Sequence, residues 1–334
     1  MLFTETQTIF KDLGDSLYNC KSPTGLPLTL IRIISLLDNN KHFDDIQIYI
    51  IDNEISKTNK DKLIDIINKY ERKIYFVDFN EYKNRLKLNM QWNISISSYA
   101  RLFVSSMLPH NLDKVLYFDC DTVIVNRLDE LWNTNMNKYY VAGVADTVSN
   151  STKSAVGIVS DGKYINAGML LINLKRWRED NIEDKFIEFI NINNGRVTHH
   201  DQGVINGVLH NKLKIIPPKF NLMTVYYTMK REDIISYYKI DSEFYSEDII
   251  QESLKNPVYI HFTPGFTTRP WIKGCKHPKK QIYLDYLEKT PWKNAKLEKD
   301  KSKFRVKVIN LMYRNLSFKI AQIICDTLMK AKLS

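Results

Sequence analysis

The sequence lacks the features that mark several classes of protein. Its 4 Cys lie far apart and form no CxxC pair, as expected of reduced thiols in a cytosol. With only 11 Gly and 10 Pro, the chain is neither collagen-like nor a flexible linker. No apolar run approaches the roughly 18 residues of a membrane-spanning helix, and residues 1–10 lack the basic start of a secretory signal. We therefore expect a cytoplasmic protein with a folded core.

Charge is distributed unevenly along the 334 residues. The formal net charge is +10, and residues 293–334 hold 11 Lys and Arg against 3 Asp and Glu. The other residues are nearly neutral, with 37 basic and 35 acidic side chains. This asymmetry predicts a tail with its own anionic partner and disfavours a nucleic-acid groove across the whole protein. We expect residues 1–292 to form the main domain and residues 293–334 a separate basic tail.

Strands and helices are predicted to alternate in the first 120 residues. Residues 46–52, 73–79 and 114–118 are short β-branched or aromatic runs, typical of buried strands. Helices are expected after Ser56, as far as about residue 70, and at 97–108. This order predicts an α/β fold in which helices cover both faces of a parallel sheet. Further strands are expected at 139–145, 164–173, 213–216 and 258–260, and further helices at 181–192 and 201–209.

Two carboxylates and a histidine follow predicted strands. Asp119 and Asp121 come directly after the strand at 114–118, and His261 follows the strand at 258–260. The carboxyl ends of such strands carry the binding site, and two acids at i and i+2 can converge on one divalent cation. Two carboxylates and one imidazole suit Mn²⁺ better than Mg²⁺, although Mg²⁺ is possible. The alternatives are solvated loop acids and a histidine that caps the edge of the sheet.

The loop after His261 is suited to phosphate. It has the sequence FTPGFTTRPW, in which Gly265 permits close backbone approach and Arg269 can bind phosphate oxygens. A metal ligand and a phosphate-binding cation within nine residues indicate more than either part alone.

Two polar clusters stand at the boundaries of predicted elements. They are residues 164–168 (YINAG) and 199–203 (HHDQG), whose amide and carboxylate groups can bind sugar hydroxyls. The alternative is that Asn166 closes a turn and Asp201 caps the helix that follows. His199 and His200 are interpreted as loop residues.

Four segments resemble the retaining glycosyltransferase family 8. They are residues 97–132, 164–177 (YINAGMLLINLKRW), 200–207 and 261–271 (HFTPGFTTRPW), and the resemblance covers about residues 29–292. It implies a GT-A fold, in which helices flank a Rossmann-like mixed sheet, together with a UDP-sugar donor and Mn²⁺. The implied reaction moves a hexose, glucose or galactose, to a glycan or glycoconjugate with retained anomeric configuration.

The resemblance also assigns roles to individual residues. Asp119, Asp121 and His261 match the family's metal ligands. Arg101 matches the Arg that holds a donor hydroxyl and the first carboxylate, and Gln202 the side chain nearest the anomeric carbon. The candidate catalytic residues are therefore Gln202, Asp201 and Arg101. Because an amide is a poor nucleophile, front-face attack is favoured over a covalent intermediate. The other candidates for donor binding are Asp52, Cys120, Asp146, Asn166, Ala167, Gly168, Gly265 and Arg269.

The sequence departs from the family at its nucleotide-binding turn. The D-D/N-N-Y turn is not legible, Asp15 and Tyr18 are its nearest equivalents, and Asn93 replaces a His near the diphosphate. Two other functions stay open: a catalytically weak relative that binds another glycosyltransferase, and a nucleotidyltransferase, although the latter's Gly-rich triphosphate loop is absent. Acceptor choice is predicted to lie in residues 220–248, whose aromatic side chains either stack on sugar rings or pack a lid helix.

The basic tail has a helical pattern. From Phe304 to Leu328 apolar residues recur at helical spacing, and Lys and Arg fill much of the remainder. This pattern predicts one amphipathic helix on the anionic inner face of a membrane, where each basic residue can add ~1 kcal/mol. The alternative is a helix docked on the domain. Lipid-linked acceptors would suit this location, no nucleic-acid partner is expected, and the oligomeric state is not predicted.

Overall fold

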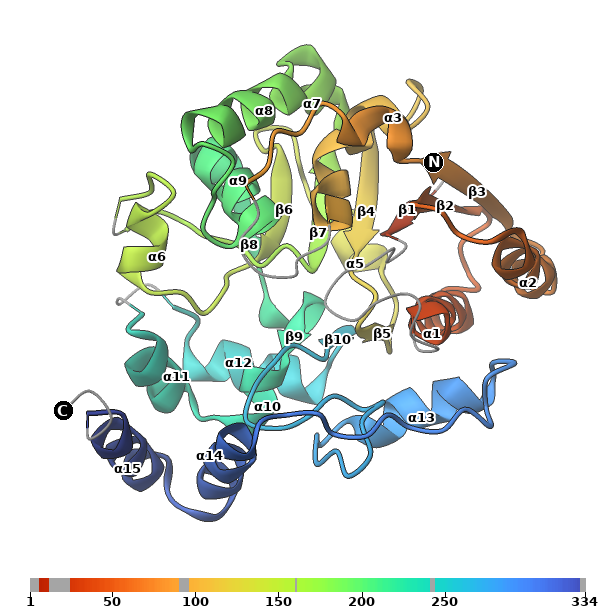
Figure 1. The fold of residues 1–334 in the computed structure, drawn as a ribbon. Helices are drawn as coiled ribbons and strands as arrows, with labels where there is room; N and C mark the ends of the chain where they lie inside the picture. Colours follow the sequence, from red (N-terminus) through yellow and green to blue (C-terminus); the bar gives the residue numbers. More distant parts are fainter. Residues whose placement is uncertain (1–5, 12–24, 90–95, 160, 241–243, 331–334) are drawn as a thin grey trace.

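A mixed seven-stranded sheet organises the chain (Figure 1). The computed structural model describes residues 6–11, 25–89, 96–159, 161–240 and 244–330. The strand order is β3-β2-β1-β4-β7-β6-β8, and β7 alone among these runs antiparallel to its neighbours. The strands are β1 (Thr6–Lys11), β2 (Ile46–Asp52), β3 (Lys73–Asp78), β4 (Lys114–Phe118), β6 (Val141–Val144), β7 (Met169–Asn173) and β8 (Leu213–Ile216). The mixed sheet agrees with the family resemblance, whereas the β–α–β order alone predicted a parallel one.

Two strands differ from the sequence-based expectation. β1 lies between β2 and β4 but was not predicted, because TQTIFK has only two apolar residues in succession. The strand predicted at 164–173 begins only at Met169, where β7 starts. Before it, the Asn166 side chain accepts a hydrogen bond from the Gly168 N–H, which closes a turn and keeps both residues out of the strand.

Alternate residues of β4 face two apolar cores. Val115 and Tyr117 pack on one side, and Leu116 and Phe118 on the other. The first side is covered by η1 (Ile96–Phe103), α4 (Val104–Met107), α7 (Leu174–Glu179), α8 (Ile182–Ile192) and α9 (His200–Leu209). The second side is covered by α1 (Gly25–Asn39), α2 (Lys57–Asn68) and α5 (Asp129–Trp132). Helices thus cover both faces of the sheet around β4.

The helix predicted at 97–108 is mainly a 3₁₀ helix. The 3₁₀ helix η1 extends from Ile96 to Phe103, and only α4 is α-helical. Such a run is longer than most 3₁₀ segments, and the serines in it compete with the backbone for hydrogen bonds. This tight helix carries Arg101 in its last turn.

A second, three-stranded sheet lies beyond the carboxyl ends of the first (Figure 1). It contains β5 (Thr122–Ile124), β9 (Leu222–Met223) and β10 (Tyr259–His261) in the order β5-β10-β9. His261 therefore belongs to this sheet and not to the large one. The remaining elements are α3 (Asn80–Lys83), α6 (Asn150–Ser154), η2 (His210–Lys212), η3 (Pro218–Phe220), α10 (Thr224–Thr228), α11 (Arg231–Tyr238), α12 (Glu247–Lys255) and α13 (Lys280–Glu288).

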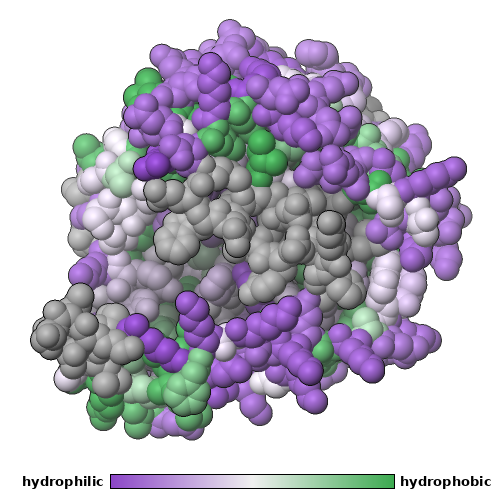
Figure 2. Space-filling view, viewed as in Figure 1, coloured by the Kyte–Doolittle hydropathy of each residue, from purple (hydrophilic) through white to green (hydrophobic). Residues whose placement is uncertain are grey.

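The tail folds as two helices where one was predicted. α14 (Phe304–Asn315) and α15 (Phe318–Lys330) lie below α10 and α11 in Figure 1. The break falls at Leu316 and Ser317, next to polar residues that favour helix ends. Figure 2 shows apolar side chains gathered at the lower left, over the tail. Among the described residues, no helix has both the length and the apolarity to cross a bilayer.

Candidate active site

Asp119 and Asp121 leave the end of β4 at the edge where the two sheets meet. Cys120 between them is buried in an apolar cluster with Val123 and Ile260. Cys120 therefore anchors the turn, while the two flanking carboxylates remain about one quarter exposed. The turn thus presents two acids outward and one apolar side chain inward. The donor-binding role of Cys120 stays a prediction.

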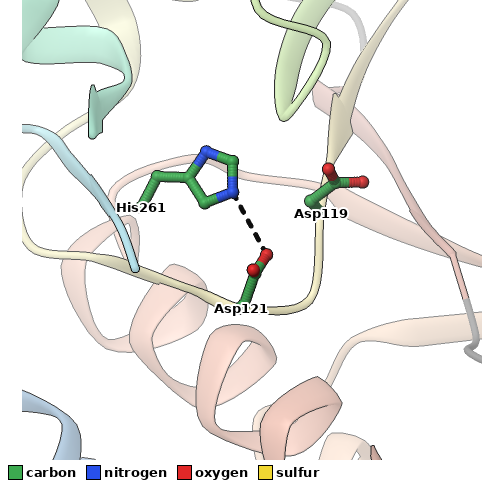
Figure 3. Close-up of side chains that lie close together, drawn as sticks. All are labelled: Asp119, Asp121 and His261. Atoms are coloured by element: carbon green, nitrogen blue, oxygen red, sulfur yellow. Dashed lines mark ion pairs between the residues drawn. The ribbon is translucent and has the colours of Figure 1, made fainter. Parts of the chain in front are cut away.

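His261 completes a group of three candidate metal ligands. β10 pairs with β5 in the register that sets His261 opposite Thr122, next to Asp121. One ligand atom from each of Asp119, Asp121 and His261 lies within 4.8 Å of the others (Figure 3). We call these three residues the candidate metal site. Two carboxylates and an imidazole can hold Mn²⁺.

The orientation of His261 is set by Asn221. The Nδ1–H of His261 donates to Asn221 Oδ1 at 3.0 Å, and this leaves Nε2 directed at Asp121 Oδ1, 3.2 Å away. An unprotonated Nε2 and a carboxylate are both acceptors, so the pair requires a cation between them, either a proton or a metal ion. Metal-binding histidines ordinarily have such a partner on the second ring nitrogen. The residues present therefore fit a divalent metal.

Gly168 leaves room for the imidazole. A Cβ added at Gly168 would lie 2.2 Å from Cε1 of His261 and 2.5 Å from its Nδ1. The Gly168 carbonyl also accepts from the Asp119 N–H at 2.8 Å and from the Tyr259 hydroxyl at 2.8 Å. Gly168 thus contacts both the segment that carries Asp119, after β4, and the strand β10, which carries His261.

Arg101 joins two carboxylates beside the candidate metal site. Its Nη2 donates to Asp119 Oδ1 at 2.9 Å, and its Nε to Asp201 Oδ2 at 2.7 Å. Its Nη1 donates to the Ala167 carbonyl, and the guanidinium lies 4.5 Å from the ring centroid of Tyr117. Only 5% of Arg101 is exposed, so these partners replace the hydrogen bonds that its guanidinium would otherwise make with water. Arg101 fixes the position of Asp119 relative to Asp201.

Neighbouring charges keep the side chains of Asp121 and Arg101 ionised. Burial alone would raise the pKa of Asp121, but His261 and Arg269 counter it and hold that pKa well below its ordinary range. Burial alone would lower the pKa of Arg101, whereas its two carboxylate partners raise it by more. Asp121 is therefore a carboxylate at neutral pH, the form that binds a cation.

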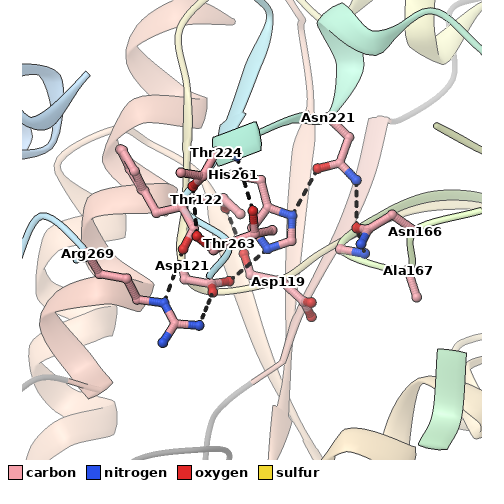
Figure 4. A network of polar contacts seen from close by, with 12 residues as sticks. Asp119, Asp121, Thr122, Asn166, Ala167, Asn221, Thr224, His261, Thr263 and Arg269 are labelled. Atoms are coloured by element: carbon pink, nitrogen blue, oxygen red, sulfur yellow. Dashed lines mark hydrogen bonds and ion pairs between the residues drawn. The ribbon is translucent and has the colours of Figure 1, made fainter. Parts of the chain in front are cut away.

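A chain of side-chain hydrogen bonds extends from the metal site to the predicted sugar-binding residues (Figure 4). Asn221 Nδ2 donates to Asn166 Oδ1 at 2.8 Å, and Asn166 Nδ2 donates to Asp146 Oδ2 at 3.2 Å. Gln202 Nε2 donates to the same Asp146 oxygen at 2.7 Å, while its Oε1 accepts from the Ala167 N–H at 3.0 Å. The residues singled out in two distant sequence clusters thus lie in one network.

The turn before Asp201 is strained. His199 and His200 have φ values of 59° and 53°, in the left-handed region that non-glycine residues rarely occupy. Each such residue costs on the order of 1–3 kcal/mol, which the surrounding structure must offset. The helix α9 begins at His200, so Asp201 does not cap it and instead pairs with Arg101. The turn formed by these two histidines is followed directly by the carboxylate that pairs with Arg101.

The loop 262–271 lies against the candidate metal site. Arg269 Nε donates to the Phe262 carbonyl at 3.1 Å, and its Nη2 is 3.6 Å from Asp121 Oδ2. Gly265 packs closely, because a Cβ there would lie 2.9 Å from Thr224 Cγ2. Arg269 therefore directs its positive charge toward the side of the site where a diphosphate was predicted.

Some predicted residues lie apart from this network or outside the described part of the chain. Asp52 is buried at the end of β2, pairs with Lys60 and accepts from the Ile55 N–H at 2.7 Å. β1 separates its strand from β4, so its nucleotide-side role stays a prediction. Asp15, Tyr18 and Asn93, named for the nucleotide turn and the diphosphate, lie outside the described residues.

A cleft opens beside this hydrogen-bond network, at Asp146. It has a volume of about 770 Å³, and Asp146 and Tyr164 are among the residues that line it. Ile215, Phe244 and Ile249 supply apolar wall, and the volume is in the range of small-ligand sites. The cleft therefore offers space next to the predicted position of the donor sugar.

Sequence reasoning missed two residues that support the site. Asn221 orients His261, and its only signal in the sequence was an amide among the apolar residues of FNLM. It is fully buried, a position where an amide must find partners. Tyr117, which lies under Arg101 and donates to Asp119 Oδ1 at 3.1 Å, gave no signal beyond its place in a strand.

A sequence model of Glycosyl transferase family 8 matches residues 16–275. Two curated relatives resemble most of the chain. General stress protein A of Bacillus subtilis (strain 168) is 28% identical over 264 residues, which cover 78% of this chain and 88% of that protein. Lipopolysaccharide 1,2-glucosyltransferase of Escherichia coli is 28% identical over 293 residues, which cover 85% and 81%.

Solved structures show the same fold. The crystal structure of galactosyltransferase LgtC in complex with donor and acceptor sugar analogs has a TM-score of 0.68 at 21% identity. The match covers 86% of this chain and 99% of that one. The GT-A fold implied by the sequence motifs is thereby confirmed.

Proposed function

The chain belongs to glycosyltransferase family 8, and we propose that it transfers a hexose, glucose or galactose, from a UDP-sugar to a glycan acceptor with retained configuration. One observation carries this proposal. Asp119, Asp121 and His261 lie at one edge of the sheet, in contact with a buried hydrogen-bond network of the kind that holds sugar hydroxyls. The lipopolysaccharide glucosyltransferase among the relatives supports a hexose as the transferred group.

The candidate metal site suits Mn²⁺, with Mg²⁺ as a possible substitute. When bound, the metal supplies positive charge that neutralises the departing diphosphate. Arg269 adds a second, fixed positive charge on the same side, 3.6 Å from Asp121. A preorganised charge of this kind stabilises a leaving group without reorganisation during the reaction.

Arg101, Asn166 and Asp201 would hold the donor sugar. The Arg101 guanidinium spans Asp119 and Asp201, so one residue links the metal side to the sugar side. Asn166 is fixed at both ends of its amide, by Asn221 and by Asp146. Groups held in this way meet the sugar without a further loss of side-chain entropy.

Retention by front-face attack is the proposed mechanism. A covalent intermediate would need a nucleophile on the β face of the sugar, the position predicted for Gln202. The Gln202 amide oxygen already accepts from Ala167, and its nitrogen donates to Asp146. An amide held at both ends is a poor nucleophile and a good positioning group. The leaving phosphate oxygen would then accept the proton of the attacking hydroxyl.

The acceptor is proposed to enter through the cleft that reaches Asp146. Its wall includes Phe244 and Tyr245, two of the aromatic residues predicted to face sugar rings. Tyr245 also bonds the ends of β6 and β8, because its hydroxyl accepts from the Ala145 N–H and donates to the Ile216 carbonyl. This rigid wall supports a role in choosing the acceptor.

The tail, residues 293–334, is proposed to bind an anionic membrane surface at the cytoplasmic face. Six large apolar side chains on α14, on α15 and at the break between them are 40–82% exposed, and we call them the outer face of the tail. They are Phe304, Val306, Leu311, Leu316, Ile320 and Ile323. Basic residues flank them, which gives the charge complementarity that a surface of anionic lipids requires. A lipid-linked glycan acceptor would be concentrated at the same surface.

Thermal-shift titration tests the donor assignment. UDP with Mn²⁺ is expected to raise the melting temperature, whereas GDP or CMP with Mn²⁺ is expected to have little effect. A hydrolysis screen of UDP-glucose, UDP-galactose and UDP-N-acetylhexosamines then identifies the sugar, with one of the first two in the lead. If no nucleotide raises the melting temperature, the result would favour a catalytically weak relative that binds a partner glycosyltransferase. A preference for a GDP- or CMP-sugar would refute the proposal.

A further inference from the structure

Four aromatic rings join the tail to the loop that follows His261. The Phe266 ring, in that loop, stacks on Tyr313 of α14, with ring centroids 3.9 Å apart and planes at 25°. Phe318 of α15 lies 6.0 Å from Phe266 and 5.0 Å from Tyr313. Tyr237 of α11 contacts all three rings at 5.4–6.2 Å. We call Tyr237, Phe266, Tyr313 and Phe318 the aromatic seam.

The seam holds the middle of a loop whose two ends are held by polar bonds. At one end, Thr224 Oγ1 donates to the Thr263 carbonyl at 2.7 Å. At the other end, the Cys275 thiol donates to the Thr268 carbonyl at 2.8 Å. Phe266 lies between these points, directly after Gly265, and Arg269 comes directly after the second point. The position of Phe266 therefore bears on both residues proposed to bind the diphosphate.

We propose that Tyr313 and Phe318 are positioning residues of the donor site. By packing on Phe266 they hold the loop in the shape that presents Gly265 and Arg269 to the donor diphosphate. The tail then has two separate surfaces, the seam that faces the loop and the outer face that remains exposed. This inference rests on the proposed function, because it assigns the tail a part in binding the UDP donor.

A consequence is that membrane binding and donor binding are coupled. A surface that orders α14 and α15 also orders the seam, so it tightens donor binding, and by linkage the donor tightens membrane binding by the same factor. One aromatic pair contributes enough to change a dissociation constant by about twofold to tenfold. The coupling is therefore expected to be modest and measurable.

The test compares variants of the full chain. The dissociation constant of UDP in the presence of Mn²⁺ is measured by calorimetry for the wild type, Tyr313→Ala, Phe318→Ala and Tyr313→Phe. Tyr75→Ala is the matched control. Tyr75 stacks on Tyr49 with ring centroids 4.8 Å apart, and it lies on β3, an edge strand of the seven-stranded sheet, outside the aromatic seam. Far-UV circular dichroism and a melting curve verify that the sheet domain stays folded in each variant.

The expected result is a twofold to tenfold weaker binding of UDP in both alanine variants, with wild-type affinity in Tyr75→Ala and Tyr313→Phe. The KM for the donor rises with it, while kcat changes less. Vesicles of phosphatidylglycerol and phosphatidylethanolamine strengthen UDP binding by the wild type and not by the alanine variants. Equal affinity in the wild type and both alanine variants would overturn this inference alone. A wild type that binds no UDP with Mn²⁺ would instead contradict the proposed function.

Discussion

The candidate metal site and the tail are built in opposite ways. At the metal site, charged groups are held by hydrogen bonds from three separate segments, and Asp119, Asp121 and His261 each have a partner. Between α14, α15 and the loop 262–271, aromatic rings provide the contacts, and the outer face of the tail is exposed. The first region is specific in geometry, and the second is adaptable.

This difference indicates what a single substitution can do in each region. A buried charge network loses its function when one member is removed, because the remaining charges stay buried without a partner. An apolar surface loses only the area of the side chain that is removed. We therefore expect large, all-or-none effects at the metal site and small, additive effects in the tail.

Asp121→Asn is expected to have the largest effect. It removes a negative ligand and leaves Arg269 and His261 facing a neutral amide. Transfer should fall by roughly 10³-fold, because metal and leaving-group stabilisation fail together. UDP release from the UDP-sugar measures the loss, and Asp61→Asn, at an exposed position of α2, is the control. A variant that keeps more than a tenth of the activity would show that Asp121 is not a ligand.

Arg101→Lys is expected to come next. Lysine keeps the charge but cannot bind Asp119, Asp201 and the Ala167 carbonyl at once. One buried carboxylate is left without its partner, which should cost about 3 kcal/mol of stability and at least 100-fold in kcat/KM. Urea unfolding and donor kinetics measure the two effects. Wild-type stability in this variant would mean that the three simultaneous bonds of the Arg101 guanidinium do not stabilise the fold.

The sequence predicted most of this charge network because its residues stand in short, ordered motifs. Asp119, Asp121, His261 and Arg269 follow strands that are legible as apolar runs. Asn221 could not be found in this way, because its role depends on β9 lying beside β10, a pairing between segments about 40 residues apart in the chain. Long-range register is decided by packing and is not written in local sequence.

The tail shows the same limit in another form. Helical periodicity predicted one helix but not the break at Leu316, which lies between Tyr313 and Phe318, the two tail residues that contact Phe266. The chain between α13 and α14 also pairs with the body, since Glu298 exchanges backbone bonds with Trp271 and Lys273. Composition predicts a basic amphipathic segment, and only tertiary contacts distinguish its two faces.

Asn221→Ala sharpens the comparison inside the metal site. The substitution removes the hydrogen-bond partner of His261 Nδ1 but changes none of the three proposed metal ligands. Mn²⁺ affinity should fall by about 10-fold to 100-fold, the usual loss when the orienting partner of a metal-binding His is removed. Titration of Mn²⁺ followed by electron paramagnetic resonance measures it directly. Unchanged affinity would show that packing against Gly168 alone orients the imidazole.

His277 offers a pH-dependent test of the region between the metal site and the tail. It packs on Phe262, with ring centroids 5.0 Å apart, and burial lowers its pKa from 6.5 to about 4. The folded chain therefore resists a proton that the unfolded chain accepts, so stability is full above pH 6.5 and decreases as the pH falls toward 4. The loss at pH 5 should be about 2 kcal/mol.

Urea unfolding of the wild type and His277→Asn at pH 7 and pH 5 checks this expectation. The asparagine can still accept from the Lys279 N–H, as His277 Nδ1 does at 3.1 Å. The variant should lose less stability between the two pH values than the wild type. An equal loss in both would assign the pH dependence to other groups.

The smallest effect is expected on the outer face of the tail. Leu311→Ser and Ile323→Ser each remove an apolar side chain that is more than half exposed. Each change should weaken binding to vesicles of anionic lipid severalfold and leave UDP affinity in solution unchanged. Co-sedimentation at low salt measures the binding. If the wild-type chain does not co-sediment with such vesicles, the outer face does not bind membranes.

The dependence of donor cleavage on metal tests the central claim most directly. The protein is incubated with UDP-glucose or UDP-galactose, first with EDTA and then after Mn²⁺ is restored, and the release of UDP is followed. We expect EDTA to stop the release and Mn²⁺ to restore it, because Asp119, Asp121 and His261 are proposed to act through a bound cation. EDTA-treated protein that still releases UDP would contradict this expectation.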